Sequence, residues 1–328
     1  MFRRLAAVIC AAMLSICLVS CSMTEIPEKS TVNQTEVPPK MLFLGDSIAS
    51  GYGLEGYTPD DNYHCRSYSN ILKDRYDEEL GRKCRHSMIN KAVSGATSAD
   101  FIEQLRSGEL DSDLADCDAV VVSIGGNDLL DIMLELVKAL GINEQGSFST
   151  DELDVFGALA LFLNINNDID KALDQFEFNI GIISDELNKR TDGTVYIQTL
   201  YDPLEYFSSI KKVTDFSSEK LGRFNEIIST NSSKGYKVID VASDFKGKAG
   251  TLTNISDLDI HPNAAGHEVI AEDVDAALRA TGFTYTTTEY GKRQLTYDGK
   301  LAVCGIFAGL AFVMLISLIV LFRTKKYE

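Results

Sequence analysis

Five short apolar runs recur along the chain and alternate with longer amphipathic stretches. The runs are "MLFLG", "SMINKAV", "AVVVSIGG", "TVYIQTL" and "YKVIDVA", and stretches such as "SYSNILKDRYDEEL" separate them. Strands that alternate with helices form a parallel sheet, because each parallel pair needs a crossover connection, and the helices then cover both faces. We therefore predict an α/β fold with its ligand site at the carboxyl ends of the strands.

Residues 1–20 have the features of an export signal. Arg3 and Arg4 precede an apolar run of signal-peptide length. The run ends in Leu-Val-Ser-Cys at residues 18–21, which resembles the lipobox of bacterial lipoproteins, where the cysteine is lipidated and becomes the mature N-terminus. We expect Cys21 to carry lipid. The alternative is an ordinary signal peptide followed by an unrelated cysteine.

Residues 301–322 contain no charged side chain. With a rise of about 1.5 Å per residue, a helix of this length spans the hydrocarbon core of a bilayer, which is roughly 30 Å thick. Basic residues follow directly, so the positive-inside rule places the tail, residues 323–328, in the cytoplasm. We expect a transmembrane helix over 301–322 that holds an extracytoplasmic body at the cell membrane. A buried core helix is the alternative.

Between the two ends we expect one globular domain, residues 40–282. The polar, proline-bearing residues 21–39 are typical of a flexible tether. Residues 283–300 alternate in a strand-like way and predict a small hairpin or stalk. Residues 148–167 contain the apolar stretch "LDVFGALALFLNI", which is compatible with a lid, an acyl-binding wall or an ordinary core-facing helix.

The charge and the cysteines narrow the possible partners. The formal net charge of −17 argues against nucleic acid, which requires a basic face. The cysteines of the expected ectodomain, Cys65, Cys84 and Cys117, do not have the spacing of a metal site. Outside the cytosol Cys65 and Cys84 could pair, while Cys117, at the start of an apolar strand, is expected to be a buried thiol.

Small and polar residues follow the predicted strands where the ligand site is expected. Ser47, Gly95 and Asn127 come after the first three apolar runs, and His261 precedes an amphipathic helix. A serine hydroxyl is a poor nucleophile until a base takes its proton and donors stabilise the developing oxyanion. Histidine is a suitable base, glycine lets a backbone N–H come close to a substrate oxygen, and an asparagine amide is a neutral donor.

Three features of the sequence have other interpretations. Gly51, Gly53 and Gly56 match the dinucleotide fingerprint G-x-G-x-x-G, but the first glycine lies past the strand end and no helix follows directly. His267 lies inside the amphipathic helix after His261, and we expect it to be structural. Ser47 taken alone is equally compatible with a helix N-cap.

Four blocks occur in the order typical of one enzyme family: Gly45-Asp46-Ser47, Gly95, Gly126-Asn127-Asp128 and His261-Pro262. Together they resemble the SGNH, or GDSL, hydrolase family across residues 40–282. The resemblance implies a flavodoxin-like three-layer α/β/α sandwich with a five-stranded parallel sheet, and it implies no metal or cofactor. It also implies that Ser47 is the nucleophile and His261 the general base. The N–H groups of Ser47 and Gly95, with the Asn127 side chain, would form the oxyanion hole.

One position departs from the family pattern. The family usually has an aspartate three residues before the histidine, and here that position is Leu258, between Asp257 and Asp259. This aspartate orients the imidazole and stabilises its protonated form. We favour Asp259 for the role, with Asp257 second. A backbone carbonyl in the aspartate's place, leaving a dyad of Ser47 and His261, is the third possibility.

These features together predict a membrane-tethered extracytoplasmic serine ester hydrolase, a lipase, esterase or acetylesterase that acts through an acyl-enzyme. The expected substrates are envelope lipids or acetylated cell-wall glycans, and the expected membrane contacts are Cys21 and residues 301–322. A thioesterase or lysophospholipase is one alternative. A non-catalytic surface-binding module on the same fold is the other.

Overall fold

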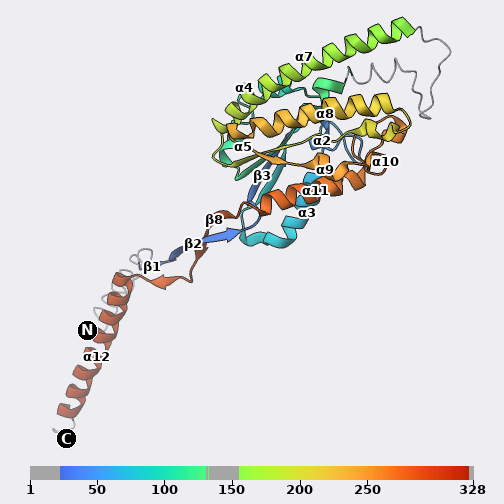
Figure 1. Ribbon diagram of the computed structural model, residues 1–328. Helices are drawn as coiled ribbons and strands as arrows, with labels where there is room; N and C mark the ends of the chain where they lie inside the picture. Colours follow the sequence, from blue (N-terminus) through green and yellow to red (C-terminus); the bar gives the residue numbers. More distant parts are fainter. Residues whose placement is uncertain (1–22, 131, 133–154, 325–328) are drawn as a thin grey trace. The chain divides into compact units, whose positions relative to one another are not determined.

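A parallel sheet of five strands forms the centre of the main body (Figure 1). The computed structural model describes residues 23–130, 132 and 155–324. The strands lie in the order β4-β3-β5-β6-β7, and every neighbouring pair is parallel. Their bounds are β3 (Lys40–Gly45), β4 (Ser87–Asn90), β5 (Ala119–Ser123), β6 (Thr194–Gln198) and β7 (Lys237–Ile239). The predicted α/β class and five-stranded parallel sheet are confirmed.

Alternate residues of the strands point to opposite faces of the sheet, so each face has its own apolar core. One core contains strand residues that pack with α4 (Ser98–Ser107), α7 (Val155–Asn188) and α8 (Lys211–Asn231): Leu42, Leu44, Val120, Val122, Val195 and Ile197. The other contains the intervening residues, which pack with α3 (Tyr68–Leu80) and α11 (Ala264–Arg279): Met41, Phe43, Val121, Tyr196 and Ile239. The result is the three-layer sandwich.

Short helices complete the connections between the strands and the long helices. They are α2 (Ser47–Ser50), η1 (Gly81–Lys83), α5 (Asp111–Asp116), η2 (Pro203–Phe207), η3 (Ser232–Lys234), α9 (Val241–Phe245), α10 (Ala249–Leu252) and η4 (Ile255–Asp257). A third, smaller apolar cluster joins η2 and η4 through Leu204, Phe207 and Ile255. It lies below the loop that carries His261, and so it supports the region where the site was predicted.

The apolar stretch before residue 167 falls partly on α7. From Ile165 onward the buried face of α7 packs into the first core through Ile169, Leu173 and Phe176. This part of the helix therefore has the ordinary core-facing role. Residues 133–154 lie outside the described residues, and so does the greater part of the segment 148–167 for which a lid was considered.

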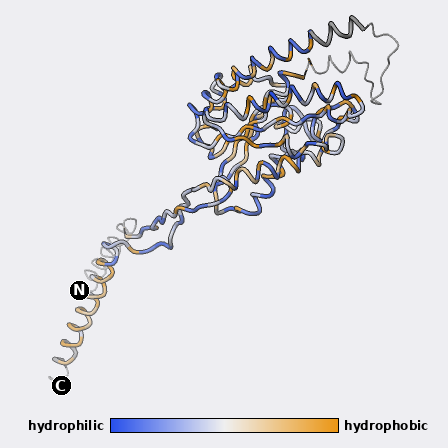
Figure 2. The backbone as a smooth tube through the Cα atoms, viewed as in Figure 1, coloured by the Kyte–Doolittle hydropathy of each residue, from blue (hydrophilic) through white to orange (hydrophobic). Residues whose placement is uncertain are grey.

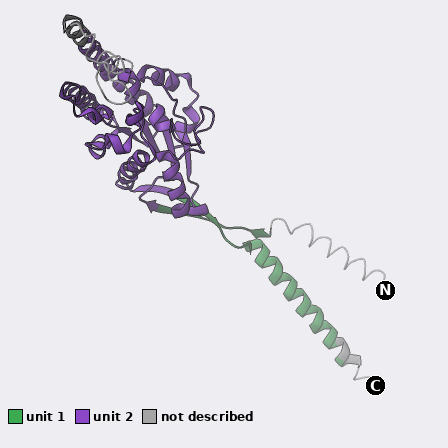
Figure 3. Cartoon of the chain, turned by 90° about the vertical axis from the view of Figure 1, so that its right-hand side faces the viewer, with its two compact units in different colours: residues 1–33, 286–328 green, residues 34–285 purple. Residues whose placement is uncertain are grey.

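The chain divides into two compact units, residues 34–285 and residues 1–33 with 286–328 (Figure 3). In the second unit, β1 (Thr24–Glu25) pairs antiparallel with β9 (Gln294–Leu295), and α12 (Tyr297–Thr324) follows.

Within the described residues, one helix is long and apolar enough to cross a membrane; its candidate span is Tyr297–Ile319. Figure 2 shows that apolar residues continue around and along α12. The expected apolar C-terminal helix is therefore present as a candidate membrane span. The predicted signal peptide and Cys21 lie outside the described residues.

The segment expected to be a flexible tether instead contains strands. Besides β1, β2 (Glu28–Thr35) pairs with β8 (Phe283–Tyr290), so β8 and β9 do not form a hairpin with each other. Side chains add to this pairing: the Asn33 amide donates to the Thr287 hydroxyl at 2.7 Å. Most residues of β2 are exposed, and exposure on both sides removes the apolar alternation by which sequence patterns reveal strands. The strand-like alternation predicted within residues 283–300 corresponds to β8.

The cysteines of the main body are free thiols. Cys65 and Cys84 are buried and unpaired, so the disulfide considered for them is absent, and Cys117 is half-buried. The Cys65 thiol contacts the carbonyl of Asn62 at 3.1 Å, and the Cys117 thiol contacts that of Leu114 at 3.2 Å. Their contacts are those of small core side chains with weak S–H donors.

His267 has the structural role expected of it. Its side chain is fully buried on α11, and Nδ1 accepts a hydrogen bond from the backbone N–H of Tyr68 at 3.2 Å, which joins α11 to α3. Burial lowers the pKa of His267 to about 3. In the unfolded chain the same side chain has a pKa of about 6.5. Between about pH 3 and pH 6.5, the unfolded chain therefore binds a proton at this histidine and the folded protein does not.

We therefore expect the free energy of unfolding to fall as the pH is lowered from about 6.5 towards about 3, and His267→Asn to weaken this dependence. The asparagine oxygen can still accept from Tyr68 but takes up no proton. Unfolding measured at several pH values checks the prediction. His64→Asn is the matched control, because the His64 side chain is largely exposed. Equal pH dependence in the wild type and His267→Asn would contradict the assignment.

Candidate active site

The turn after β3 presents Ser47 at the carboxyl end of this strand, beside the central strand β5. Gly45 has a φ of +117°, and a Cβ atom there would lie 1.8 Å from the carbonyl oxygen of Ser123. Only glycine fits this close approach of β3 to β5. The approach lets the N–H of Asp46 donate to the Ser123 carbonyl at 2.9 Å, and Ser47 begins α2 directly afterwards.

Asp46 fixes the conformation of this turn. Its Oδ1 accepts one hydrogen bond from the Ile48 N–H and one from the Ser123 hydroxyl, both at 3.1 Å. The side chain is 1% exposed, and this burial raises its pKa to about 7 although both hydrogen bonds act in the opposite direction. Asp46 therefore acts as the N-cap of α2 and ties the nucleophile turn to the end of β5.

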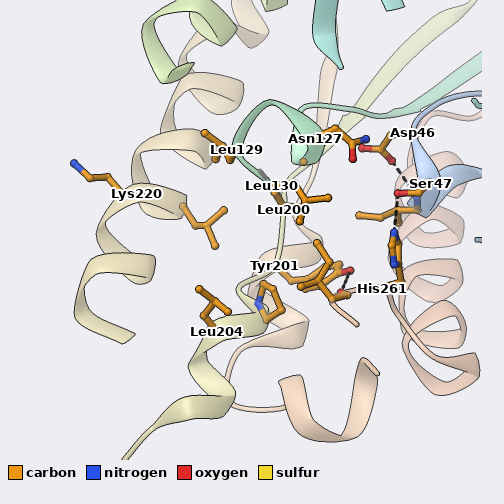
Figure 4. Close-up of a pocket in the computed structure, with 15 residues that line it drawn as sticks. Asp46, Ser47, Asn127, Leu129, Leu130, Leu200, Tyr201, Leu204, Lys220 and His261 are labelled. Carbon is orange, nitrogen blue, oxygen red and sulfur yellow. Dashed lines mark hydrogen bonds between the residues drawn. The ribbon is translucent and has the colours of Figure 1, made fainter. Parts of the chain in front are cut away.

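A chain of polar contacts runs from Ser47 through His261 to Asp259. Figure 4 shows its first link, between Ser47 and His261. Nε2 of His261 lies 2.9 Å from Oγ of Ser47, and Nδ1 lies 2.5 Å from Oδ1 of Asp259. The same carboxylate oxygen accepts the backbone N–H of His261 at 3.0 Å. With Nδ1 donating to a carboxylate, Nε2 is left as the acceptor that can take the serine proton.

Leu258 explains how the carboxylate comes from a position one residue later than the family pattern. Its φ is +58°, and it is the only non-glycine residue with a positive φ in the described part of the chain. This left-handed residue ends η4 and turns the backbone so that Asp259 reaches the imidazole, whereas Asp257 is exposed. The sequence left open whether Asp259, Asp257 or a backbone carbonyl contacts the imidazole. In the structure, the group that contacts it is the Asp259 carboxylate.

The loop around His261 is held on both sides. The Tyr201 hydroxyl donates to the carbonyl of Ile260 at 2.8 Å, and the Asn254 N–H donates to the carbonyl of His261 at 3.0 Å. Asn263 then caps α11 by accepting the N–H groups of Ala265 and Gly266. Tyr201 is itself buried and stacks on Phe245 at a centroid distance of 4.4 Å. The imidazole is thus positioned by the backbone as well as by Asp259.

Asn127 and the Gly95 loop come together across from the serine. Asn127 lies in the short helical segment 126–130, and its amide donates to the carbonyl of Ala96 at 2.9 Å, which leaves one amide hydrogen. Gly95 has a φ of +86°, with no atom within 4 Å of a Cβ placed there. Among the described residues, no hydrogen bond occupies the backbone N–H of Ser47 or Gly95. These groups are the donors predicted for an oxyanion.

Asp128 joins the two loops that carry these donors, a role not predicted from the sequence. Its Oδ2 accepts the N–H of Ser98 at 2.8 Å, and its Oδ1 accepts the Ser98 hydroxyl. Asn179 of α7 donates to the same hydroxyl at 2.8 Å. Burial raises the pKa of Asp128. The aspartate therefore fixes the start of α4, and with it the preceding Gly95 turn, to the Asn127 segment.

Tyr52 is a second residue that the sequence analysis missed. Its half-exposed ring lies against the imidazole of His261, with centroids 4.7 Å apart and planes tilted by 52°. The glycines on either side, Gly51 and Gly53, have φ values of +82° and +83°, and a Cβ on Gly53 would come within 3.5 Å of Asp259. The glycine pattern thus serves tight turns near the site and not a dinucleotide. The sequence signal that could have identified Tyr52 is its position between two glycines, shortly after the expected nucleophile.

Within residues 23–130, 132 and 155–324, no group of three His, Cys, Asp or Glu side chains is arranged to hold a metal ion. The site brings together a hydroxyl, an imidazole with its carboxylate, and a set of N–H donors. This combination is suited to acyl transfer.

Comparison with known proteins agrees with this geometry. A model of the GDSL-like lipase/acylhydrolase family matches residues 43–269. The chain is 23% identical over 274 residues to the uncharacterized protein YpmR of Bacillus subtilis (strain 168). The match covers 82% of this chain and 93% of that protein.

Two solved structures share the fold. The lipase Lip_vut3 from a goat rumen metagenome is 22% identical with a TM-score of 0.53, and the match covers 73% of this chain and 96% of that one. The extracellular lipase of Streptomyces rimosus is 18% identical with a TM-score of 0.53, and the match covers 73% and 99% of the two chains. At these identities the similarity establishes the fold.

The contact between Asp259 and His261 leads to a test with a built-in control. We expect Asp259→Asn to lower kcat for ester hydrolysis by about 10⁴-fold, because the amide favours the wrong imidazole tautomer. Asp257→Asn, the matched control on the other side of Leu258, should change kcat less than about threefold, since an exposed surface charge contributes little. Steady-state kinetics on both variants decide the matter. A severe loss confined to Asp257→Asn, or a mild effect of both changes, would contradict the role of Asp259.

Proposed function

Because the chain belongs to the GDSL-like lipase/acylhydrolase family, we propose that it hydrolyses carboxylic esters through a covalent intermediate on Ser47. The observation that carries this proposal is the uninterrupted chain of contacts from Ser47 Oγ through the His261 imidazole to the Asp259 carboxylate. It lies at the carboxyl end of β3, beside the donors of Ser47, Gly95 and Asn127.

In the first half of the proposed reaction, Ser47 Oγ attacks the carbonyl carbon of the ester while His261 Nε2 takes the hydroxyl proton. The carbonyl oxygen becomes an oxyanion, which the backbone N–H groups of Ser47 and Gly95 and the remaining amide hydrogen of Asn127 stabilise. Asp259 accepts the hydrogen bond from Nδ1 and stabilises the imidazolium. The bond from carbon to the leaving oxygen then breaks, and Nε2 returns its proton to that oxygen, which releases the alcohol.

In the second half, a water molecule replaces the alcohol. His261 Nε2 takes one water proton as the water oxygen attacks the acyl carbon, and the same donors stabilise the second oxyanion. The bond from carbon to Ser47 Oγ breaks and the serine regains its proton from Nε2. The carboxylic acid leaves, and the site returns to its starting protonation.

We further propose that the hydrolase domain is extracytoplasmic and tethered to the cell membrane. The apolar helix α12 and the basic residues after it support a membrane span with a cytoplasmic tail. The Leu-Val-Ser-Cys sequence supports a lipid on Cys21. Esters of the cell envelope, either lipids or acetylated cell-wall glycans, are the substrates that such a location favours.

Two other activities use the same residues or the same fold. A thioesterase or lysophospholipase would use the same serine, and assays with a thioester and a lysophospholipid separate these substrates from simple esters. A non-catalytic surface-binding module would keep the fold without turnover. The contact of His261 with Ser47 at 2.9 Å weighs against it, since a binding module has no need of an activated serine.

The nucleophile can be tested with p-nitrophenyl butyrate as the substrate. We expect Ser47→Ala to lower kcat by at least about 10³-fold, because no other group can form the acyl-enzyme. Ser208→Ala, which changes an exposed serine, is the matched control and should behave as the wild type. Thermal unfolding of both variants shows whether the fold is intact. A folded Ser47→Ala variant that keeps more than about a tenth of the activity would refute the proposal.

The two anchors can be separated by fractionating cells. We expect the variant that lacks residues 301–328 to remain in the membrane fraction through the lipid on Cys21, and the additional change Cys21→Ala to release it. Cys117→Ala in the same shortened chain is the control and should stay with the membrane. Complete release of the shortened chain that still carries Cys21 would argue against lipidation.

A further inference from the structure

A cavity extends from the catalytic serine into the protein (Figure 4). Ser47, Asn127 and His261 line one end of it, so a carbonyl group placed for attack by Ser47 would stand in its mouth. In Figure 4 the lining residues Leu204 and Lys220 lie well away from Ser47, so the cavity continues beyond the position of the reacting carbonyl group.

The wall beyond the catalytic residues is built almost entirely from aliphatic side chains. They come from the segments that follow β5 and β6, from η2 and α8, and from the residue before His261: Leu129, Leu130, Leu200, Leu204, Leu221 and Ile260. Leu129, Leu204 and Leu221 are each less than 10% exposed, so they are fixed by the surrounding core. A wall of this kind favours an apolar ligand.

Lys220 and Tyr201 also line the cavity, and their polar atoms already have partners within the protein. The Lys220 ammonium is bound by Asp170 at 2.9 Å, and Figure 4 shows it pointing away from Ser47 and His261. The Tyr201 hydroxyl donates to the carbonyl of Ile260 at 2.8 Å. A polar ligand such as a sugar would have to give up water here without finding replacement hydrogen bonds, which is unfavourable.

One side of the His261 imidazole lies against a residue outside the cavity. Tyr52, which is half-exposed, packs on the imidazole and is not among the residues that line the cavity. Because Nε2 has to reach the leaving oxygen while the acyl carbon stays bonded to Ser47, we place the alcohol on the Tyr52 side. The apolar cavity is then the space available to the acyl chain.

We propose that this cavity binds the acyl chain of the substrate and makes the protein selective for apolar acyl groups longer than acetyl. The inference rests on the proposed ester hydrolysis and adds the class of ester. It favours fatty acyl esters over acetylated glycans. Leu200 is a specificity-determining residue, because it lines the cavity and its side chain would lie 3.9 Å from a Cβ on Gly126, the neighbour of Asn127.

The test uses the full chain in detergent and p-nitrophenyl esters that differ only in the acyl group. We expect kcat/KM to rise about fourfold for each added CH₂ between acetate and butyrate, the ratio that burial of one CH₂ gives, and to stay at least about tenfold above acetate for octanoate. Octyl acetate, with the long chain on the alcohol, should show no such gain over ethyl acetate. A gain on the alcohol side instead would overturn the assignment.

Leu200→Phe narrows the cavity and should lower the octanoate-to-acetate ratio of kcat/KM by at least about tenfold, since the bulkier ring occupies the space of several CH₂ groups. The backbone of Leu200 is bound by Asn225 through both its N–H and its carbonyl, at 2.8 Å each, and so holds its place. Leu80→Phe, at a half-buried leucine on α3, is the matched control and should keep the wild-type ratio.

If Leu200→Phe does not fold, Gly126→Ala provides a smaller obstruction, because its Cβ would make only ordinary contacts. Alkylboronic acids, which mimic the oxyanion, give a measurement on the wild type: inhibition should tighten about fourfold per CH₂. Equal rates on acetate and octanoate with flat inhibition would overturn the acyl cavity and leave ester hydrolysis standing. Failure to hydrolyse any ester would overturn both.

Discussion

The site depends on the close approach of β3 and β5 at Gly45. A carbonyl oxygen of β5 occupies the space where any other residue would carry a side chain, and the backbone of the next residue donates to it. Asp46 then reaches back to Ser123 and forward to Ile48, which fixes the first turn of α2. Since both strands are buried in the sheet, Ser47 is held at the end of closely packed backbone and not on an exposed loop.

The sequence predicted the features that arise from periodic burial. The alternation of apolar runs and amphipathic stretches is produced by the layers themselves, and so the parallel sheet and its covering helices could be read directly. The strand β2 carries no such signal because most of its residues are exposed, and its polar sequence predicts a flexible tether instead. The alternating residues of β8 do predict a strand, but not that its partner is β2. A strand that pairs through its backbone and through short polar side chains does not show in the hydropathy of the chain.

At the site, the types of residue could be predicted from the sequence, but which side chains point toward His261 could not. Ser47, Asn127 and His261 followed from their places after strands and before a helix. The choice between Asp257 and Asp259 depends on the φ of Leu258, and no sequence rule predicts a left-handed leucine, because that conformation is unfavourable for residues with a Cβ. Tyr52 was missed for a related reason: its contact with His261 depends on two glycine turns that the sequence shows only as a spacing.

The left-handed turn at Leu258 also affects how relatives of this chain are classified. A search that requires an acidic residue three positions before the histidine would record this chain as lacking its third catalytic member and would group it with inactive homologues. In the folded chain a carboxylate nevertheless lies against the imidazole, supplied from the following position. A sequence motif of this kind reflects the backbone conformation that is common in the family. The chemistry requires only that a carboxylate oxygen lies within hydrogen-bond distance of Nδ1. Homologues that lack the usual aspartate are better judged by whether a neighbouring acidic residue is preceded by one that can adopt the left-handed turn.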